Sequence, residues 1–193
     1  MEKWHSLLQK YFPSYHSDDG SSENAIDQSV EFQNLRKVIS ESNTSICESI
    51  RKELALTAIK KGLAFNECDR TSIVYKRSLG LRFPISKNHK EGGEIEYIEL
   101  VLAISLLAPV YFLEVVTSKI QEGVVLEEKV SLESVSPETF NFISEIMMKK
   151  GYSRMLSSEY GKVISDRISL EIEPGSFTYF NAFFGNSIGD LLY

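Results

Sequence analysis

The chain has few cysteines and lacks an uninterrupted apolar segment long enough to cross a membrane as a helix. Its two cysteines, Cys47 and Cys68, are too few to staple a domain of 193 residues. We therefore expect reduced thiols in a reducing compartment, with a disulfide between them as the alternative. The most apolar stretch, Glu94 to Ser118, is bracketed by charges, and Pro109 would interrupt a helix near its middle. Residues 1–12 lack the basic start and apolar core of a signal peptide. The sequence predicts a cytoplasmic protein without a membrane-spanning segment.

The common motifs of catalysis are absent as well. The chain has no glycine-rich nucleotide loop, no paired histidines at helical spacing, no cysteine pair at zinc spacing and no Gly-x-Ser-x-Gly segment. His16 precedes Asp18 and Asp19, but no further His or Cys lies at ligand spacing, so we interpret this segment as a solvated loop. We expect no metal, no cofactor and no catalytic residue, and binding is favoured over catalysis.

The balance of charge is acidic. The formal net charge is −6, from 21 Lys and Arg against 27 Asp and Glu, in a composition otherwise ordinary for a globular protein. Nucleic-acid phosphates attract Lys and Arg, so this charge disfavours non-specific binding to nucleic acid. It favours solubility and long-range attraction to basic partners.

The apolar stretch has the two-residue period of β-structure. Even-numbered residues from 96 to 104 point to one face and odd-numbered residues from 95 to 103 to the other, and both sets become apolar toward the end of the segment. Pro109 cannot donate a ladder hydrogen bond, so we expect a bend there. A second strand, Val110 to Thr117, follows, with Phe112 on one face. These two strands are predicted to form the centre of a sheet.

Helices are predicted before the sheet. Residues 1–26 are expected to form a short helix and then a mobile polar loop from Ser14 to Asn24. Residues 27–62 have apolar residues at helical spacing and end at Gly62, which is typical of a helix C-terminus. Ser42 to Ser45 prefer helix caps to helix interiors, and whether they divide this segment into two helices stays open. The residues of the predicted apolar stripe are Leu35, Val38, Ile39, Ile46, Ile50, Leu54 and Ala58.

Residues 72–193 are predicted to form the sheet together with one later helix. Before the central strands we expect a strand from Ser72 to Phe83, then Pro84 and a polar loop from Ser86 to Gly93. After them we expect a strand from Val124 to Leu132. Four consecutive strands with short connections imply antiparallel pairing.

The remainder of the chain adds the helix and more strand. The helix covers residues 137–150 and ends at Gly151. We then expect a strand from Val163 to Ile172, a turn at Pro174-Gly175, and the aromatic segment Phe177 to Phe184, interpreted as core. The fold class is α+β: an antiparallel β-sheet meander with N-terminal helices and one later helix packed mainly on one face, the whole chain forming a single domain.

The C-terminal segment resembles a known family. A strand, then Pro174-Gly175, then the aromatic strand FTYFNAFFG is similar to the close of some bacterial immunity proteins that neutralise polymorphic or contact-dependent toxins. The size and acidity of the chain are similar too. The resemblance implies a cognate toxin protein as partner and carries over no catalytic residue.

The predicted partner-binding residues are acidic. Toxins that attack nucleic acid present Lys and Arg at the active site, so an acidic cover complements them and speeds encounter. The alternative is that these carboxylates only solvate the sheet. The residues lie on two late strands and their turns: Glu122, Glu127, Glu128, Glu133, Glu171 and Glu173.

Two other functions stay open. A small acidic chaperone would hold a secreted effector chain, and a homodimer would favour that interpretation. An enzyme with an unmarked active site would bring His89 together with Tyr or Glu side chains in a deep pocket.

Overall fold

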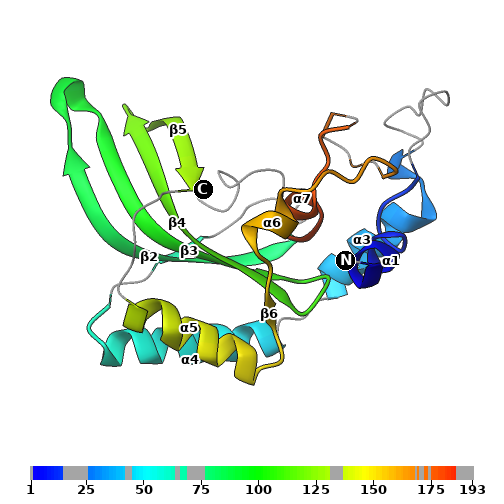
Figure 1. The fold of residues 1–193 in the computed structure, drawn as a ribbon, viewed down its shortest axis with the longest axis horizontal. Helices are drawn as coiled ribbons and strands as arrows, with labels where there is room; N and C mark the ends of the chain where they lie inside the picture. The colour runs from blue at the N-terminus through cyan, green and yellow to red at the C-terminus, as the bar shows by residue number, and fades with distance from the viewer. Residues whose placement is uncertain are drawn as a thin grey trace.

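The protein is described by a computed structural model, which covers residues 2–14, 26–41, 45–63, 66–68, 77–130, 137–167, 169, 172–173 and 175–185. In this part of the chain one sheet has the order β1-β2-β3-β4-β5, antiparallel throughout, with β6 added parallel to β4 (Figure 1). The α+β class and the antiparallel meander are therefore confirmed. The strands are β1 (Asn66–Cys68), β2 (Ser78–His89), β3 (Ile95–Ser105), β4 (Val110–Gln121), β5 (Val124–Val130) and β6 (Ser153–Arg154). The helices are α1 (Glu2–Leu8), α3 (Val30–Glu41), α4 (Ser45–Lys60), the 3-10 helix η2 (Glu91–Gly93), α5 (Pro137–Lys149), α6 (Ser157–Tyr160) and α7 (Tyr179–Phe183).

The central strands β3 and β4 are buried on both faces over residues 100–104 and 110–113, as predicted for the apolar end of this segment. On the face that we call the helix face, Leu100 and Leu102 pack in one cluster with residues of α4 and α5. On the opposite face, which we call the aromatic face, Val101 and Phe112 pack in a second cluster with residues of α1, α3 and α7. Figure 1 shows α4 and α5 beneath the sheet and α7 on its other side. The sheet therefore lies between two cores, and the prediction that the helices pack mainly on one face is wrong.

The predicted apolar stripe of residues 27–62 is divided between these two cores. Leu35 and Ile39 of α3 belong to the aromatic-face cluster, whereas Ile50 and Leu54 of α4 belong to the helix-face cluster. The question left open by the sequence is answered: α3 ends at Glu41 and α4 begins at Ser45. Two helices can reach opposite faces of a sheet, and one straight helix cannot.

Glycines end α4 and α5 as predicted. Gly62 and Gly151 have φ of +69° and +82°, the left-handed conformation of a helix terminus. Beyond them, the N–H of Leu63 donates to the carbonyl of Ala58 at 2.8 Å, and the N–H of Tyr152 donates to the carbonyl of Met147 at 2.9 Å. Each turn satisfies helix-end carbonyls that would otherwise lack a donor.

The prediction that the chain leaves the sheet at Pro84 is wrong. β2 continues to His89 and pairs with β3 along this length, with a bulge between Pro84 and Ser86. The described part of β1 pairs only with residues 80–82, so Pro84 lies on a stretch of β2 where β1 requires no N–H donor. The connection is reduced to a tight turn, closed by the N–H of Lys90 donating to the Glu94 carbonyl at 2.8 Å.

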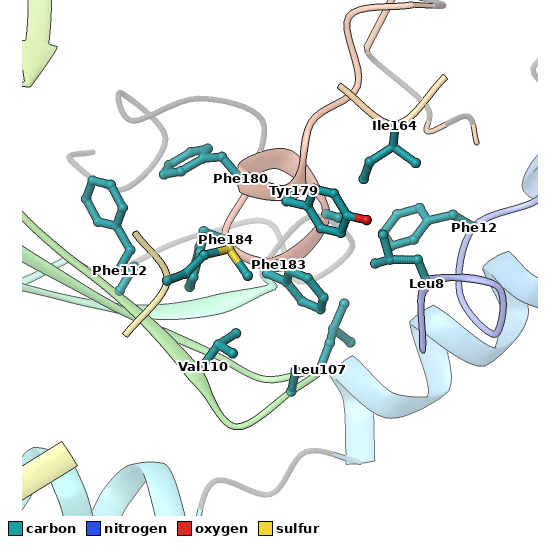
Figure 2. Close-up of a cluster of buried hydrophobic side chains, with 14 of the residues drawn as sticks. Leu8, Phe12, Leu107, Val110, Phe112, Ile164, Tyr179, Phe180, Phe183 and Phe184 are labelled. Atoms are coloured by element: carbon teal, nitrogen blue, oxygen red, sulfur yellow. The ribbon is translucent and has the colours of Figure 1, made fainter. Parts of the chain in front are cut away.

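The predicted C-terminal strands are also wrong. Residues 163–167 form only isolated bridges, Val163 to Thr178 and Ser14 to Arg167, and no continuous strand. The aromatic segment is the short helix α7 rather than a strand, because Thr178 and Asn181 cap its first turn reciprocally. Its role as core is confirmed: the α7 residues are buried, and Figure 2 shows Phe180, Phe183 and Phe184 among the side chains of the aromatic face.

Buried polar groups of β2 and the residue before it hold α7 in place. Arg77 is fully buried and donates to the Asn181 carbonyl at 2.5 Å and to Ser169 Oγ at 2.9 Å. Ser78 Oγ donates to the Phe184 carbonyl at 2.7 Å. These hydrogen bonds join the start of β2 to the last described segment of the chain.

Some predictions concern residues outside the described part. They include most of the loop from Ser14 to Asn24, the side chains of Ile46, Cys47 and Cys68, and the first residues of the strand predicted from Ser72. The β5 strand confirms the prediction for Val124 to Leu132 as far as Val130. Among the described helices, none has the length and apolar character needed to span a membrane.

Candidate functional site

Two hairpin ends extend beyond the helices that cover the sheet. We call them the distal hairpins: residues 84–98, the end of β2 and β3, and residues 117–127, the end of β4 and β5 (Figure 1). Because β3 pairs with β4, the hairpins lie side by side, and Gln121 Nε2 donates to the Gly92 carbonyl at 3.0 Å across their turns. This end of the sheet carries two of the predicted partner-binding residues, Glu122 and Glu127.

The turn of the second hairpin holds Glu122 in an unusual backbone conformation. Glu122 and Gly123 have φ of +50° and +80°, and the flanking Gln121 and Val124 pair with each other. Positive φ at both central positions is the geometry of a type I′ turn, whose twist suits a hairpin. Asn, Asp or Gly normally fills the first position, and Glu there costs about 1 kcal/mol. Glu122 is exposed, and no described residue forms an ion pair with its carboxylate.

Glu127 has a partner within the chain. Its Oε2 lies 2.6 Å from Lys119 Nζ, and this hydrogen bond is the main reason why the pKa of Lys119 is raised. Glu96 is paired with Lys119 in the same row of the sheet, and hydrogen bonds from Lys90 and then Asn88 lower the pKa of Glu96. These residues form a row of oppositely charged pairs across the helix face. Glu127 therefore pairs with Lys119 and solvates the sheet, independently of any contact with a partner protein.

Three carboxylates at the turns have no such partner. Glu91 lies in the first turn, Glu94 directly follows it and Glu122 lies in the second turn, and none of them forms a salt bridge with another described residue. Glu94 is still near enough to Lys119 for its charge to help raise the pKa of that lysine. The nearby Lys90 pairs with Glu96 at 3.1 Å, and Lys87 Nζ lies over the Tyr97 ring, 5.2 Å from its centroid. The distal hairpins therefore carry an excess of negative charge, with five glutamates against three lysines.

The other predicted site residues are not gathered with these. Glu128 pairs with Ser118 through the backbone, but its side chain, like the whole of Glu133 and Glu171, is outside the described residues. Glu173 is exposed in the turn that precedes α7, where its carbonyl accepts the N–H of Ser176 at 3.0 Å. Figure 1 shows that this segment, drawn in orange, lies away from the β4–β5 hairpin. Of the six predicted residues, the structure thus brings together Glu122 and Glu127.

Two ion pairs of the sheet, one buried and one half-buried, were not predicted from the sequence. Glu99 is only 4% exposed and pairs with Arg82 on the neighbouring strand β2. Burial raises the pKa of Glu99, and this effect outweighs the opposing attraction of Arg82. A carboxylate inside a stretch that is buried on both faces requires a cation nearby. Arg82, on the strand predicted to precede this stretch, was the residue in the sequence that could have indicated the pair.

The second pair joins β6 to β4. Arg154 Nη2 lies 2.9 Å from Glu114 Oε1 and donates to the Leu113 carbonyl at 2.8 Å, while its guanidinium lies 4.6 Å from the centroid of the Phe140 ring. Burial, and then the charge of Glu114, raise the pKa of Tyr160. Each charge in the two pairs lies beside an opposite charge. We therefore assign both pairs the structural role of holding neighbouring strands together.

The arrangement offers little to a metal ion. No group of three or more His, Cys, Asp or Glu side chains is placed to hold one within the described residues. The enzyme interpretation depended on His89, which is exposed at the last position of β2, opposite Ile95. Glu99 is buried and Glu114 is partly buried, and both lie further along the sheet.

Comparison of the chain with family models, curated proteins and solved structures found no match.

Proposed function

We propose that the chain is an immunity protein that binds and neutralises a bacterial toxin protein through its distal hairpins. The observation that carries the proposal is the excess of carboxylates over lysines in the distal hairpins, with Glu91, Glu94 and Glu122 at the two adjacent turns, in a chain of net charge −6. The class of partner is inferred only from the sequence resemblance of Pro174-Gly175 and FTYFNAFFG, because the aromatic segment is helix α7 and not the strand which that resemblance assumed.

Charge complementarity explains how such a surface would act. A toxin that attacks nucleic acid carries Lys and Arg where the phosphates bind, and an acidic surface attracts those groups before contact. The attraction is screened beyond about 8 Å at physiological ionic strength, so it raises the association rate most at low salt. Charge placed on protruding turns can also enter a concave active site.

The conformation of Glu122 supports a role for its carboxylate. A residue held at positive φ where Asn or Gly would fit better lowers the stability of the turn. The presence of Glu at such a position supports a requirement for the longer acidic side chain. Beside it, Val124 and Leu126 are 61% and 53% exposed and supply the apolar area that interface centres need.

The test is a binding measurement with an inactivated toxin encoded next to the gene for this chain. Replacing Glu91, Glu94 and Glu122 with Gln should lower the association rate about tenfold at low salt and leave the dissociation rate nearly unchanged. The loss should shrink as salt is added.

A matched control removes the same number of charges elsewhere. Glu41 of α3 and Glu138 and Glu145 of α5 are exposed, and their replacement with Gln should leave the association rate within about twofold of the unmodified chain. Equal losses in both variants would show a general effect of net charge and contradict the assignment to the distal hairpins. A stable homodimer that binds unfolded chains and ignores the toxin would favour the chaperone alternative.

A further inference from the structure

We draw no further inference here: the strongest candidate, the buried Arg82–Glu99 pair where the distal hairpins meet the covered part of the sheet, is already satisfied by its own opposite charges, and a switch built on it would rest on the pKa of Glu99 alone.

Discussion

The two ends of β3 and β4 are built differently, although each strand runs continuously from one end to the other. In the covered half, residues 100–104 and 110–113 are buried, with one core above the sheet and one below. In the distal hairpins, residues 95–97 and 119–121 of the same strands are only partly buried. The comparison indicates that the covered half of the sheet provides most of the stability of the fold. The other end is left accessible, so it can bind a partner at little cost in stability.

Different forces act in the two halves. Burying a large apolar side chain stabilises the folded state by about 1.5–3 kcal/mol. Exposed ion pairs such as Lys119 with Glu127 contribute about 0–1 kcal/mol, and salt screens them. Substitutions should therefore separate the halves by the size of their effect on the free energy of unfolding.

The largest effect is expected for Phe112→Ala. Phe112 is fully buried, and its ring contacts those of Tyr160, Phe180 and Phe184. Truncating it should lower the free energy of unfolding by about 3–5 kcal/mol, as measured by chemical denaturation. The matched distal variant, Leu126→Ala, should change it by less than about 0.5 kcal/mol. Similar losses in the two variants would remove the distinction between the halves.

A smaller effect is expected at Glu122. Glu122→Asn should raise the free energy of unfolding by about 1 kcal/mol, because Asn tolerates the left-handed conformation better than Glu. Glu122→Gln keeps the strain and removes only the charge, so its stability should match that of the unmodified chain. Both variants should bind the toxin more slowly. A stabilised Asn variant that binds at the original rate would contradict a role for the Glu122 carboxylate.

The pH dependence of stability should distinguish two carboxylates of β3. The raised pKa of Glu99 means that its protonated form is favoured by folding, so its contribution to stability grows as pH falls toward the ordinary carboxyl range and is lost as pH rises through the folded-state pKa. The lowered pKa of Glu96 means the reverse, a contribution present at neutral pH and lost as pH falls through its folded-state value.

Each carboxylate can be tested by replacement with Gln. Subtracting the stability of Glu99→Gln from that of the unmodified chain should give a difference that rises on acidification from neutral pH. The same subtraction for Glu96→Gln should give a difference that falls in more acidic solution. Two slopes of the same sign would show that burial does not separate Glu99 from the distal surface.

The sequence predicted the parts of the fold that depend on local pattern. Alternation in β3 and β4, and the glycines after α4 and α5, are signals within one segment, and each was confirmed. The end of β2 was missed because Ser86 to His89 are polar and follow a proline, and only pairing with β3 makes them a strand. Helix α7 was missed because five residues are too few to show a helical period.

The candidate site could be predicted only in part for a related reason. Glu122 and Gly123 are recognisable as a turn, so the exposure of Glu122 followed from the sequence. The partner of Glu127, and the pairing of Glu99 with Arg82, depend on the register between strands. Register is set by the whole sheet, so no single segment of the sequence contains it.

Amide hydrogen exchange of the free chain tests the division of the sheet most directly, because it measures both halves of the same strands in one experiment. Amides of residues 100–104 and 111–115 should exchange only through global unfolding, with their protection lowered by Phe112→Ala. Amides of residues 95–97 and 119–121 should exchange through local opening, at lower free energy and with little response to that substitution. Uniform protection along the full length of β3 and β4, falling equally in the variant, would contradict the account.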